Sequence, residues 1–198
     1  MRRAKQMLNG CQAGNVRGAN MMSFTIGAWR VSAEQGALPL IYKDYKSHAI
    51  FVDEGDVDDR DGNVFFIGVT SPGNYSGWPE TVICHRYSPS DYGFNPGFLI
   101  VPEENILFVG AGTNLFAFDL ENHTRLWGDR LDIGFFSWHR HKEFILMSAE
   151  LEFGVWTTSA KKLWSTFVEP PWSFEIINET VVLDIMGTKK TLSLATGK

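Results

Sequence analysis

Cysteine is scarce in this sequence. The chain has only Cys11 and Cys84, and neither lies in a Cys-x-x-Cys pair. Two cysteines are too few for the disulfide framework of a small secreted domain, so a reduced, cytoplasmic location is the default prediction. Cys84 stands inside the apolar run TVICHRY, and we expect it to be a buried thiol.

Long apolar runs are also missing. No stretch approaches the roughly 18 apolar residues that a membrane-spanning helix needs, and the start of the chain lacks the apolar core of a secretory signal. Residues 1–22 contain Lys and Arg but no Asp or Glu. We expect a flexible N-terminal arm there, or an over-long start with the true beginning near Met21 or Met22. An organelle transit peptide is the alternative.

An excess of positive charge is absent as well. The formal net charge is −5 over 198 residues. Because binding to phosphate groups needs a positive face, the charge argues against a nucleic-acid partner and against an acidic membrane surface. The sequence also contains none of the common nucleotide-binding, protease or hydrolase motifs, so we expect no catalytic residues.

Aromatic and apolar residues are abundant. They make up 14% and 44% of the chain, which is enough for a sizeable core. From Ser23 onward the sequence is dominated by short runs rich in β-branched and aromatic residues and bounded by Gly, Pro, Asn or Asp, such as SFTIGAWRV, NVFFIGV, TVICHRY, NILFVG, NLFAFDL and LEFGVW. No window shows a convincing helical stripe, because Gly36 and Pro39 interrupt the nearest one. We predict a single all-β domain of antiparallel hairpins over residues 23–198.

A repeat of about 37 residues runs through the second half of the chain. Trp127 and Trp164 stand 37 residues apart, and the same offset places Phe116 on Phe153 without any gap. A second step of the same length brings the apolar run at 181–183 under the runs at 107–109 and 144–146. A fixed period of this size is typical of repeat architectures. Each unit contains about four short strands, as in a propeller blade.

The segment NLFAFDLENHTRLW resembles the blade motif of quinoprotein-like (PQQ-type) and WD-type β-propellers, and LSLATGK resembles the turn of the same motif. The resemblance covers about residues 97–198 and implies a β-propeller-like fold or an incomplete propeller. From Ser23 the chain offers 176 residues, which allows between four and five blades. Either an N-terminal strand such as SFTIGAWRV completes the last blade, or the array stays open and exposes sheet edges.

Two loops interrupt the pattern of strands. The acidic segment DEGDVDDRDG contains Asp53, Asp56, Asp58 and Asp61, and oxygen-rich loops suit Ca²⁺. Its register departs from a calcium-binding loop, so a solvated connection is the favoured interpretation and a Ca²⁺ site within Asp53–Asp61 the alternative. The segment SPGNYSGWPE is an enlarged hairpin loop that carries two aromatic side chains.

A pair of histidines is a weak candidate for a metal site. His139 and His141 are two residues apart on a predicted strand, so both rings point to the same face. Glu150 lies across the expected hairpin and is the third candidate ligand. Contact between these histidines and a neighbouring strand on an exposed face is the simpler interpretation.

Most of the recurring tryptophans are predicted to pack between sheets rather than to bind a ligand. Tyr75 and Trp78, in the enlarged loop, are better placed to be exposed. The favoured hypothesis is therefore a non-catalytic module that binds a protein or a small ligand at a loop rim, using Tyr75, Trp78, Asp56 and Asp58. The alternative is a small-ligand or metal-dependent enzyme with a site on the repeat axis. Open sheet edges would also allow a homo-oligomer.

Overall fold

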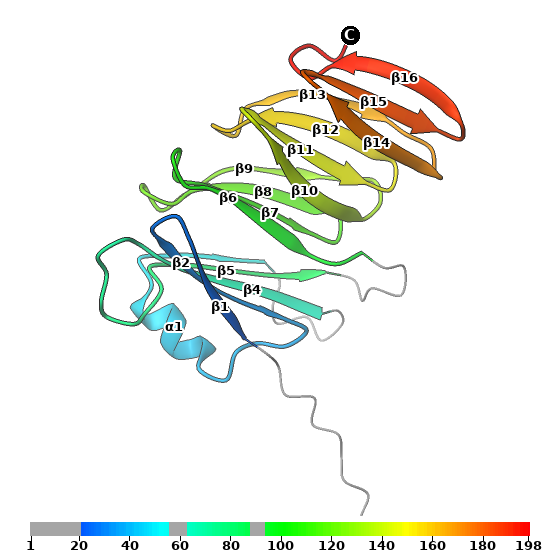
Figure 1. The fold of residues 1–198 in the computed structure, drawn as a ribbon. Coiled ribbons are helices and arrows are strands. Elements are labelled where there is room, and N and C mark those ends of the chain that lie inside the picture. The colour runs from blue at the N-terminus through cyan, green and yellow to red at the C-terminus, as the bar shows by residue number, and fades with distance from the viewer. Residues whose placement is uncertain (1–20, 56–62, 88–93) are drawn as a thin grey trace, which may run out of the picture.

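A computed structural model describes residues 21–55, 63–87 and 94–198. These residues form four stacked sheets and one short helix (Figure 1). The first sheet has the strand order β1-β2-β4-β5-β3. Its strands are β1 (Met22–Ile26), β2 (Trp29–Gln35), β3 (Phe51–Glu54), β4 (Asn63–Thr70) and β5 (Thr81–Tyr87). β1 thus begins at Met22, at the predicted boundary of the N-terminal arm, whose residues 1–20 lie outside the described ranges.

The other three sheets are simple meanders in which sequential strands pair antiparallel. The second sheet contains β6 (Gly97–Val101), β7 (Ile106–Ala111), β8 (Asn114–Asp119) and β9 (Thr124–Arg130). The third contains β10 (Phe135–His141), β11 (Phe144–Ala149), β12 (Glu152–Thr157) and β13 (Lys162–Phe167). The fourth contains β14 (Trp172–Ile177), β15 (Thr180–Ile185) and β16 (Thr188–Ser193). The predicted all-β, blade-like architecture is therefore confirmed.

Three details of the first sheet differ from the prediction. The segment SFTIGAWRV is not one strand, because Gly27 takes a positive φ of 60° and turns the chain so that Ile26 pairs with Trp29. β3 runs parallel to β5 rather than antiparallel. A helix, α1 (Tyr42–His48), follows Pro39 and contradicts the expectation of no helix.

Helix α1 covers the outer face of the first sheet. Tyr42 and Tyr45 lie three residues apart and share one face of the helix, and both rings pack on Phe66, with centroids 6.0 and 5.4 Å away. Cys84 is buried in the same cluster, as predicted, and burial raises the pKa of its thiol to about 11. This seven-residue helix is held by tertiary packing, which is why no periodic pattern marked it.

Consecutive sheets are joined by separate apolar cores. The first and second sheets pack through a cluster that includes Phe65, Val109 and Phe118, and the second and third through one that includes Phe108, Phe135 and Trp156. The third and fourth sheets share a cluster that includes Phe153, Val155 and Leu183. The inner strands β7 and β11 are buried on both faces, so they read as continuous apolar runs rather than alternating ones.

The repeat is confirmed, but not as an ungapped alignment. Strand pairing and core packing make Leu107 equivalent to Ile145 and to Val181, at spacings of 38 and then 36 residues. Trp127 pairs with Ala117, and Trp164 pairs with Val155, so the two tryptophans occupy equivalent positions in their sheets. These two tryptophans keep the 37-residue spacing. The turns between the strands account for the one-residue difference between the 38-residue and 37-residue spacings. The predicted match of Phe116 with Phe153 is therefore wrong by one position.

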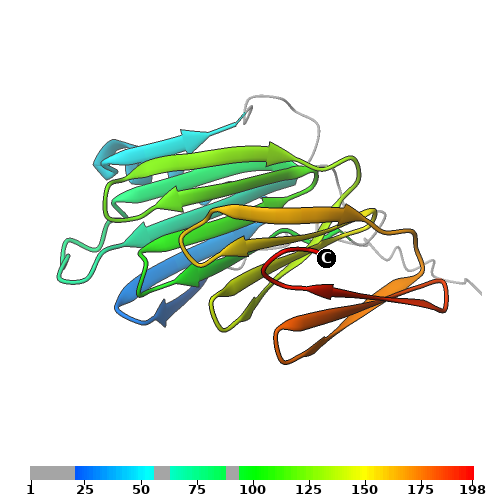
Figure 2. The ribbon, with the colours of Figure 1, turned by 90° about the horizontal axis from the view of Figure 1, so that it is seen from above.

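The array is open. β1 pairs with β2 inside the first sheet, so the predicted alternative in which it completes the last blade is wrong. Seen from above, the first and fourth sheets lie at opposite ends of the stack and do not meet (Figure 2). Two described strands lie at the edges of the fourth sheet, β14 on one side and β16 on the other.

Candidate functional site

The two loops singled out from the sequence leave opposite ends of the first sheet. The loop at 71–80 joins the end of β4 to the start of β5, which are antiparallel neighbours. The acidic segment connects the end of β3 to the start of β4, and β3 is parallel to β5. Glu54 and Asn63, its described flanks, therefore lie far along the strands from the loop at 71–80 (Figure 1). The expectation of one common rim is wrong.

The structure describes only residues 53–55 of the acidic segment. Asp56, Asp58 and Asp61 lie outside the described residues. Asp53 is buried, and its carboxylate accepts a hydrogen bond from His85 Nε2 at 2.7 Å and pairs with Arg125 at 3.3 Å. This Asp53 carboxylate joins the first sheet to the second, because Arg125 belongs to β9. A calcium ion bound there would have to displace these partners.

The structure separates the histidine candidates from their proposed third ligand. His139 and His141 do share a face of β10, opposite Leu146 and Phe144 of the core between the third and fourth sheets. His139 packs against Phe174, and the His141 ring contacts the carbonyl oxygen of Asn178 at 2.8 Å. Glu150 lies in the turn at the other end of this hairpin. Among residues 21–55, 63–87 and 94–198, no group of three His, Cys, Asp or Glu could hold a metal ion.

The loop at 71–80 is held by ring stacking and by internal hydrogen bonds. Trp78 is half-buried and stacks on the His48 ring of α1, with centroids 4.3 Å apart and planes 6° apart. Asn74 donates to the carbonyl oxygen of Trp78 at 3.3 Å and accepts from the Ser76 amide at 2.8 Å. Tyr75 projects from this frame and is 94% exposed. The expectation of exposure therefore holds for Tyr75, whereas Trp78 anchors the loop.

The base of the loop is held by a carboxylate. Glu80 accepts a hydrogen bond from the Ser71 amide at 2.9 Å. Burial alone would raise the pKa of Glu80, but hydrogen bonds from Ser71 and Asn74 outweigh it and leave this pKa below its ordinary value. Glu80 is therefore ionised at neutral pH, and its charge keeps the two ends of the loop together.

A groove of about 350 Å³ runs between this loop and the turns of the second sheet. Its apolar lining consists of the exposed Pro72 and of Trp29 and Leu120, which are buried beneath it. Its polar surface comes from Ser71, from Asn105 in the β6–β7 turn, and from Glu121 and His123 in the β8–β9 turn. The groove reaches the volume range of about 300–1,000 Å³ that is usual for ligand sites, and sequence reasoning had not identified it.

The polar groups of the groove are positioned before any partner arrives. Asn105 donates to Glu121 at 3.1 Å, and Thr81 Oγ1 lies 3.1 Å from Nδ1 of His123. Asp119 accepts hydrogen bonds from the backbone amides of Glu121 and Asn122 at 3.0 and 2.9 Å, which fixes the turn that carries them. The sequence signal for this turn was the Asp-x-x-Asn pattern before His123, which favours a side-chain-capped turn.

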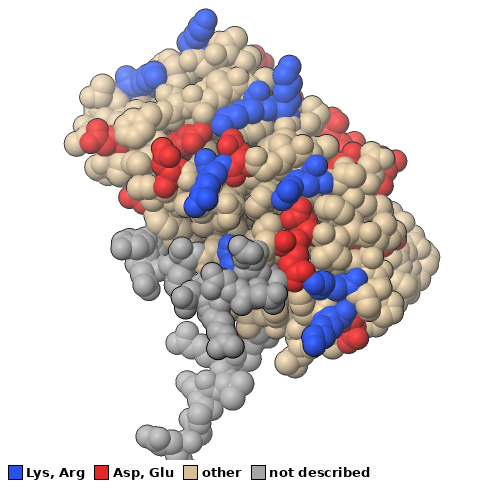
Figure 3. Space-filling model, turned by 180° about the vertical axis from the view of Figure 1, so that it is seen from behind, with Lys and Arg blue, Asp and Glu red and all other residues tan. Residues whose placement is uncertain are grey.

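Charge is finely mixed on the surface. On the face seen in Figure 3, Lys and Arg side chains alternate with Asp and Glu, and no broad area of one sign stands out among the described residues. Within the same described residues, no helix is both long and apolar enough to cross a bilayer.

The comparisons with known proteins concern the fold alone. No protein-family model matches the sequence, and neither does any curated protein. Similar solved structures include Hsv2 of Kluyveromyces lactis, with 12% identity and a TM-score of 0.41 over 68% of this chain and 41% of that one. BamB from Moraxella catarrhalis has 8% identity and a TM-score of 0.39 over 70% and 44% of the two chains. The computationally designed Ika4 protein has 13% identity and a TM-score of 0.47 over 98% and 99%.

Hsv2 and BamB have propeller-like folds, and this chain spans less than half the length of each. The function is argued below from the residues of this chain.

Proposed function

We propose that this protein is a non-catalytic binding module that holds a segment of a partner protein in the groove beside the loop at 71–80. The observation that carries the proposal is an almost fully exposed Tyr75 on a loop held by internal hydrogen bonds, whose base forms one wall of a groove. Loops held on a rigid scaffold are common binding elements, and tyrosine is enriched in protein interfaces because it offers a large ring and a hydroxyl group.

The groove suits an extended segment with mixed chemistry. Pro72 would contact apolar side chains, while Asn105, Glu121 and His123 would form hydrogen bonds with the backbone or with polar side chains. Because these polar groups are already held in place, binding would cost little ordering on this side of the interface.

Affinity purification with the wild-type chain and two variants tests the proposal. Tyr75→Ala removes the exposed ring, and Met186→Ala removes another exposed apolar side chain, from the β15–β16 turn. Proteins recovered by the wild type and by Met186→Ala, but lost with Tyr75→Ala, would support the loop at 71–80, which borders the groove, as part of the docking site. Recovery that is unchanged by Tyr75→Ala and by replacement of residues 72–78 with a Gly-Ser linker would refute it.

Self-association through sheet edges is a less favoured mode of interaction. The edge strand β16 carries Lys189 and Lys190, and both side chains are exposed. Charged side chains on an edge strand, lysine above all, oppose pairing with a strand from another molecule. Light scattering across a range of concentrations would detect such association directly.

A further inference from the structure

A second hollow lies at the opposite end of the strands from the groove. It is formed by Asp132 and Ile133 in the β9–β10 connection, by Leu151 and Glu152 where β12 begins, and by the stretch Ser165–Phe167 of β13. We call it the β13 notch. Its volume is about 170 Å³, which is closer to one long side chain than to a drug-sized ligand.

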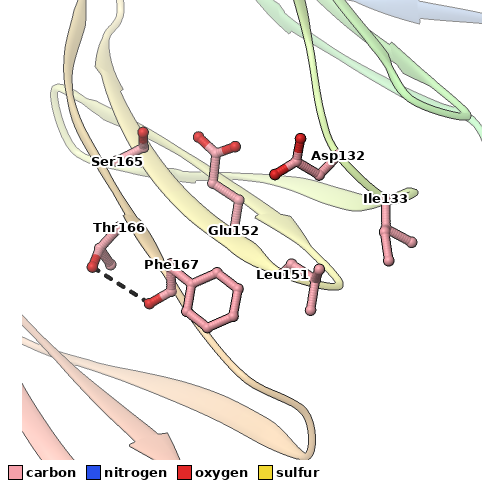
Figure 4. A pocket seen from close by; sticks show the side chains of 7 residues that line it. All are labelled: Asp132, Ile133, Leu151, Glu152, Ser165, Thr166 and Phe167. Atoms are coloured by element: carbon pink, nitrogen blue, oxygen red, sulfur yellow. Dashed lines mark hydrogen bonds between the residues drawn. The ribbon is translucent and has the colours of Figure 1, made fainter.

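The lining of the β13 notch is divided by chemistry. Figure 4 shows the carboxylates of Asp132 and Glu152 on the same side as the Ser165 hydroxyl, and the apolar side chains of Leu151 and Phe167 on the other side. Phe167 is 64% exposed, so the apolar wall is open to solvent. An occupant would therefore meet apolar contacts along one part of its length and negative charge along another.

The negative charge in the notch is not balanced by the chain itself. Asp132 has no hydrogen-bond or ion-pair partner within the part of the chain that the structure describes. Glu152 lies 3.6 Å from the ammonium group of Lys162, but that group is closer to Asp129, at 3.0 Å, and lies over the Trp156 ring. Asp129 and Glu152 thus share one ammonium group, and Asp132 pairs with none among the described residues.

These features select one class of occupant. An acidic group would be repelled by the carboxylates, and a purely apolar side chain would remove water from them without replacing their hydrogen bonds. A long basic side chain matches both halves, because its methylene stem packs on apolar surface while its charged head stays at the polar edge. Arginine fits better than lysine, because its forked guanidinium group can donate to two carboxylates and a hydroxyl at once.

We propose that the β13 notch is a docking site for an arginine side chain of a partner protein or peptide. Phe167 and Leu151 contact the stem of this side chain, and Asp132 and Glu152 bind its guanidinium group. The site is independent of the groove beside the loop at 71–80, because the two lie at opposite ends of the strands.

Amide NMR titration of the full chain with the tripeptide acetyl-Gly-Arg-Gly-amide tests this proposal. The same tripeptide with citrulline in place of arginine keeps the shape and removes the charge. We expect saturable shifts at Leu151, Glu152 and the stretch 165–167 with arginine, and binding at least about threefold weaker with citrulline, the factor typical of one partly exposed ion pair.

Asp132→Asn tests the carboxylate that has no internal partner, and it should weaken arginine binding by at least about threefold. Glu175→Gln is the matched control, since it removes one exposed acid from β14 and should leave the affinity unchanged. Tyr75→Ala should also have no effect, which separates this test from that of the proposed function. Equal binding of arginine and citrulline, or shifts spread over the acidic surface and unchanged by Asp132→Asn, would overturn the proposal.

Discussion

Tryptophans on the outer strands β9 and β13 link the second sheet to the third and the third to the fourth through a hydrogen bond, and replacing one of them should lower the stability of the protein. Trp164 Nε1 donates to the carbonyl oxygen of Leu194 at 2.7 Å, just as Trp127 Nε1 donates to that of Ala160 at 2.6 Å. Trp164→Phe keeps an aromatic ring but removes the donor and leaves the carbonyl without its partner. Such a loss costs about 1–3 kcal/mol. For a chain of this size the melting temperature should fall by roughly 2–12 °C.

Trp138 provides the matched control. Its Nε1 is buried and has no hydrogen-bond partner among the described residues, although its ring packs on Phe108, Phe135 and Trp156. Trp138→Phe makes the same change of ring and loses no hydrogen bond. Differential scanning calorimetry should show a clearly larger decrease for Trp164→Phe. A decrease for Trp138→Phe that equals or exceeds it would refute the role assigned to the hydrogen bond.

Three further predictions concern other parts of the stack. A Cβ at Gly110 would lie 2.6 Å from ring atoms of Phe135, so Gly110→Ala should destabilise the protein by about 1–3 kcal/mol in urea unfolding, and an unchanged midpoint would contradict this. Asp53→Ala removes the carboxylate bound to buried His85 and should cost about 1.5–3 kcal/mol in the same assay. The Glu80 carboxylate, whose pKa is lowered, stabilises the loop base above that pKa and loses this effect as the pH falls through it. The protection factors of the loop amides, corrected for the intrinsic exchange rate at each pH, should therefore fall in acid in the wild type, whereas Glu80→Gln should show weak protection at every pH.

The sequence predicted the parts of this fold that rest on local pattern. Apolar runs bounded by turn residues located nearly every strand, and the spacing of Trp127 and Trp164 revealed the repeat. Helix α1 was not predicted, because its stability comes from the packing of Tyr42 and Tyr45 on Phe66. The 38- and 36-residue spacings were not recognised, because apolar residues occupy both faces of a buried strand. Shifting the alignment of two such strands by one position therefore leaves the apolar pattern unchanged.

The candidate site was predictable only in part. The turn-rich composition around Tyr75 indicated an exposed loop, and the loop is where the pattern placed it. The groove joins Trp29 to Asn105 and His123, residues that are far apart in the chain and are brought together by the packing of two sheets. The separation of the two loops also depends on the parallel pairing of β3 with β5, which no local pattern indicates.

Site-specific photocrosslinking in cells tests the central claim most directly. Benzoylphenylalanine placed at Tyr75 would lie on the exposed tip of the loop, and the same group placed at Met186 would lie at a distant turn that is also exposed. The proposed function predicts a discrete crosslinked protein from position 75 and none from position 186. A crosslink from position 186 alone, or identical products from both positions, would contradict it.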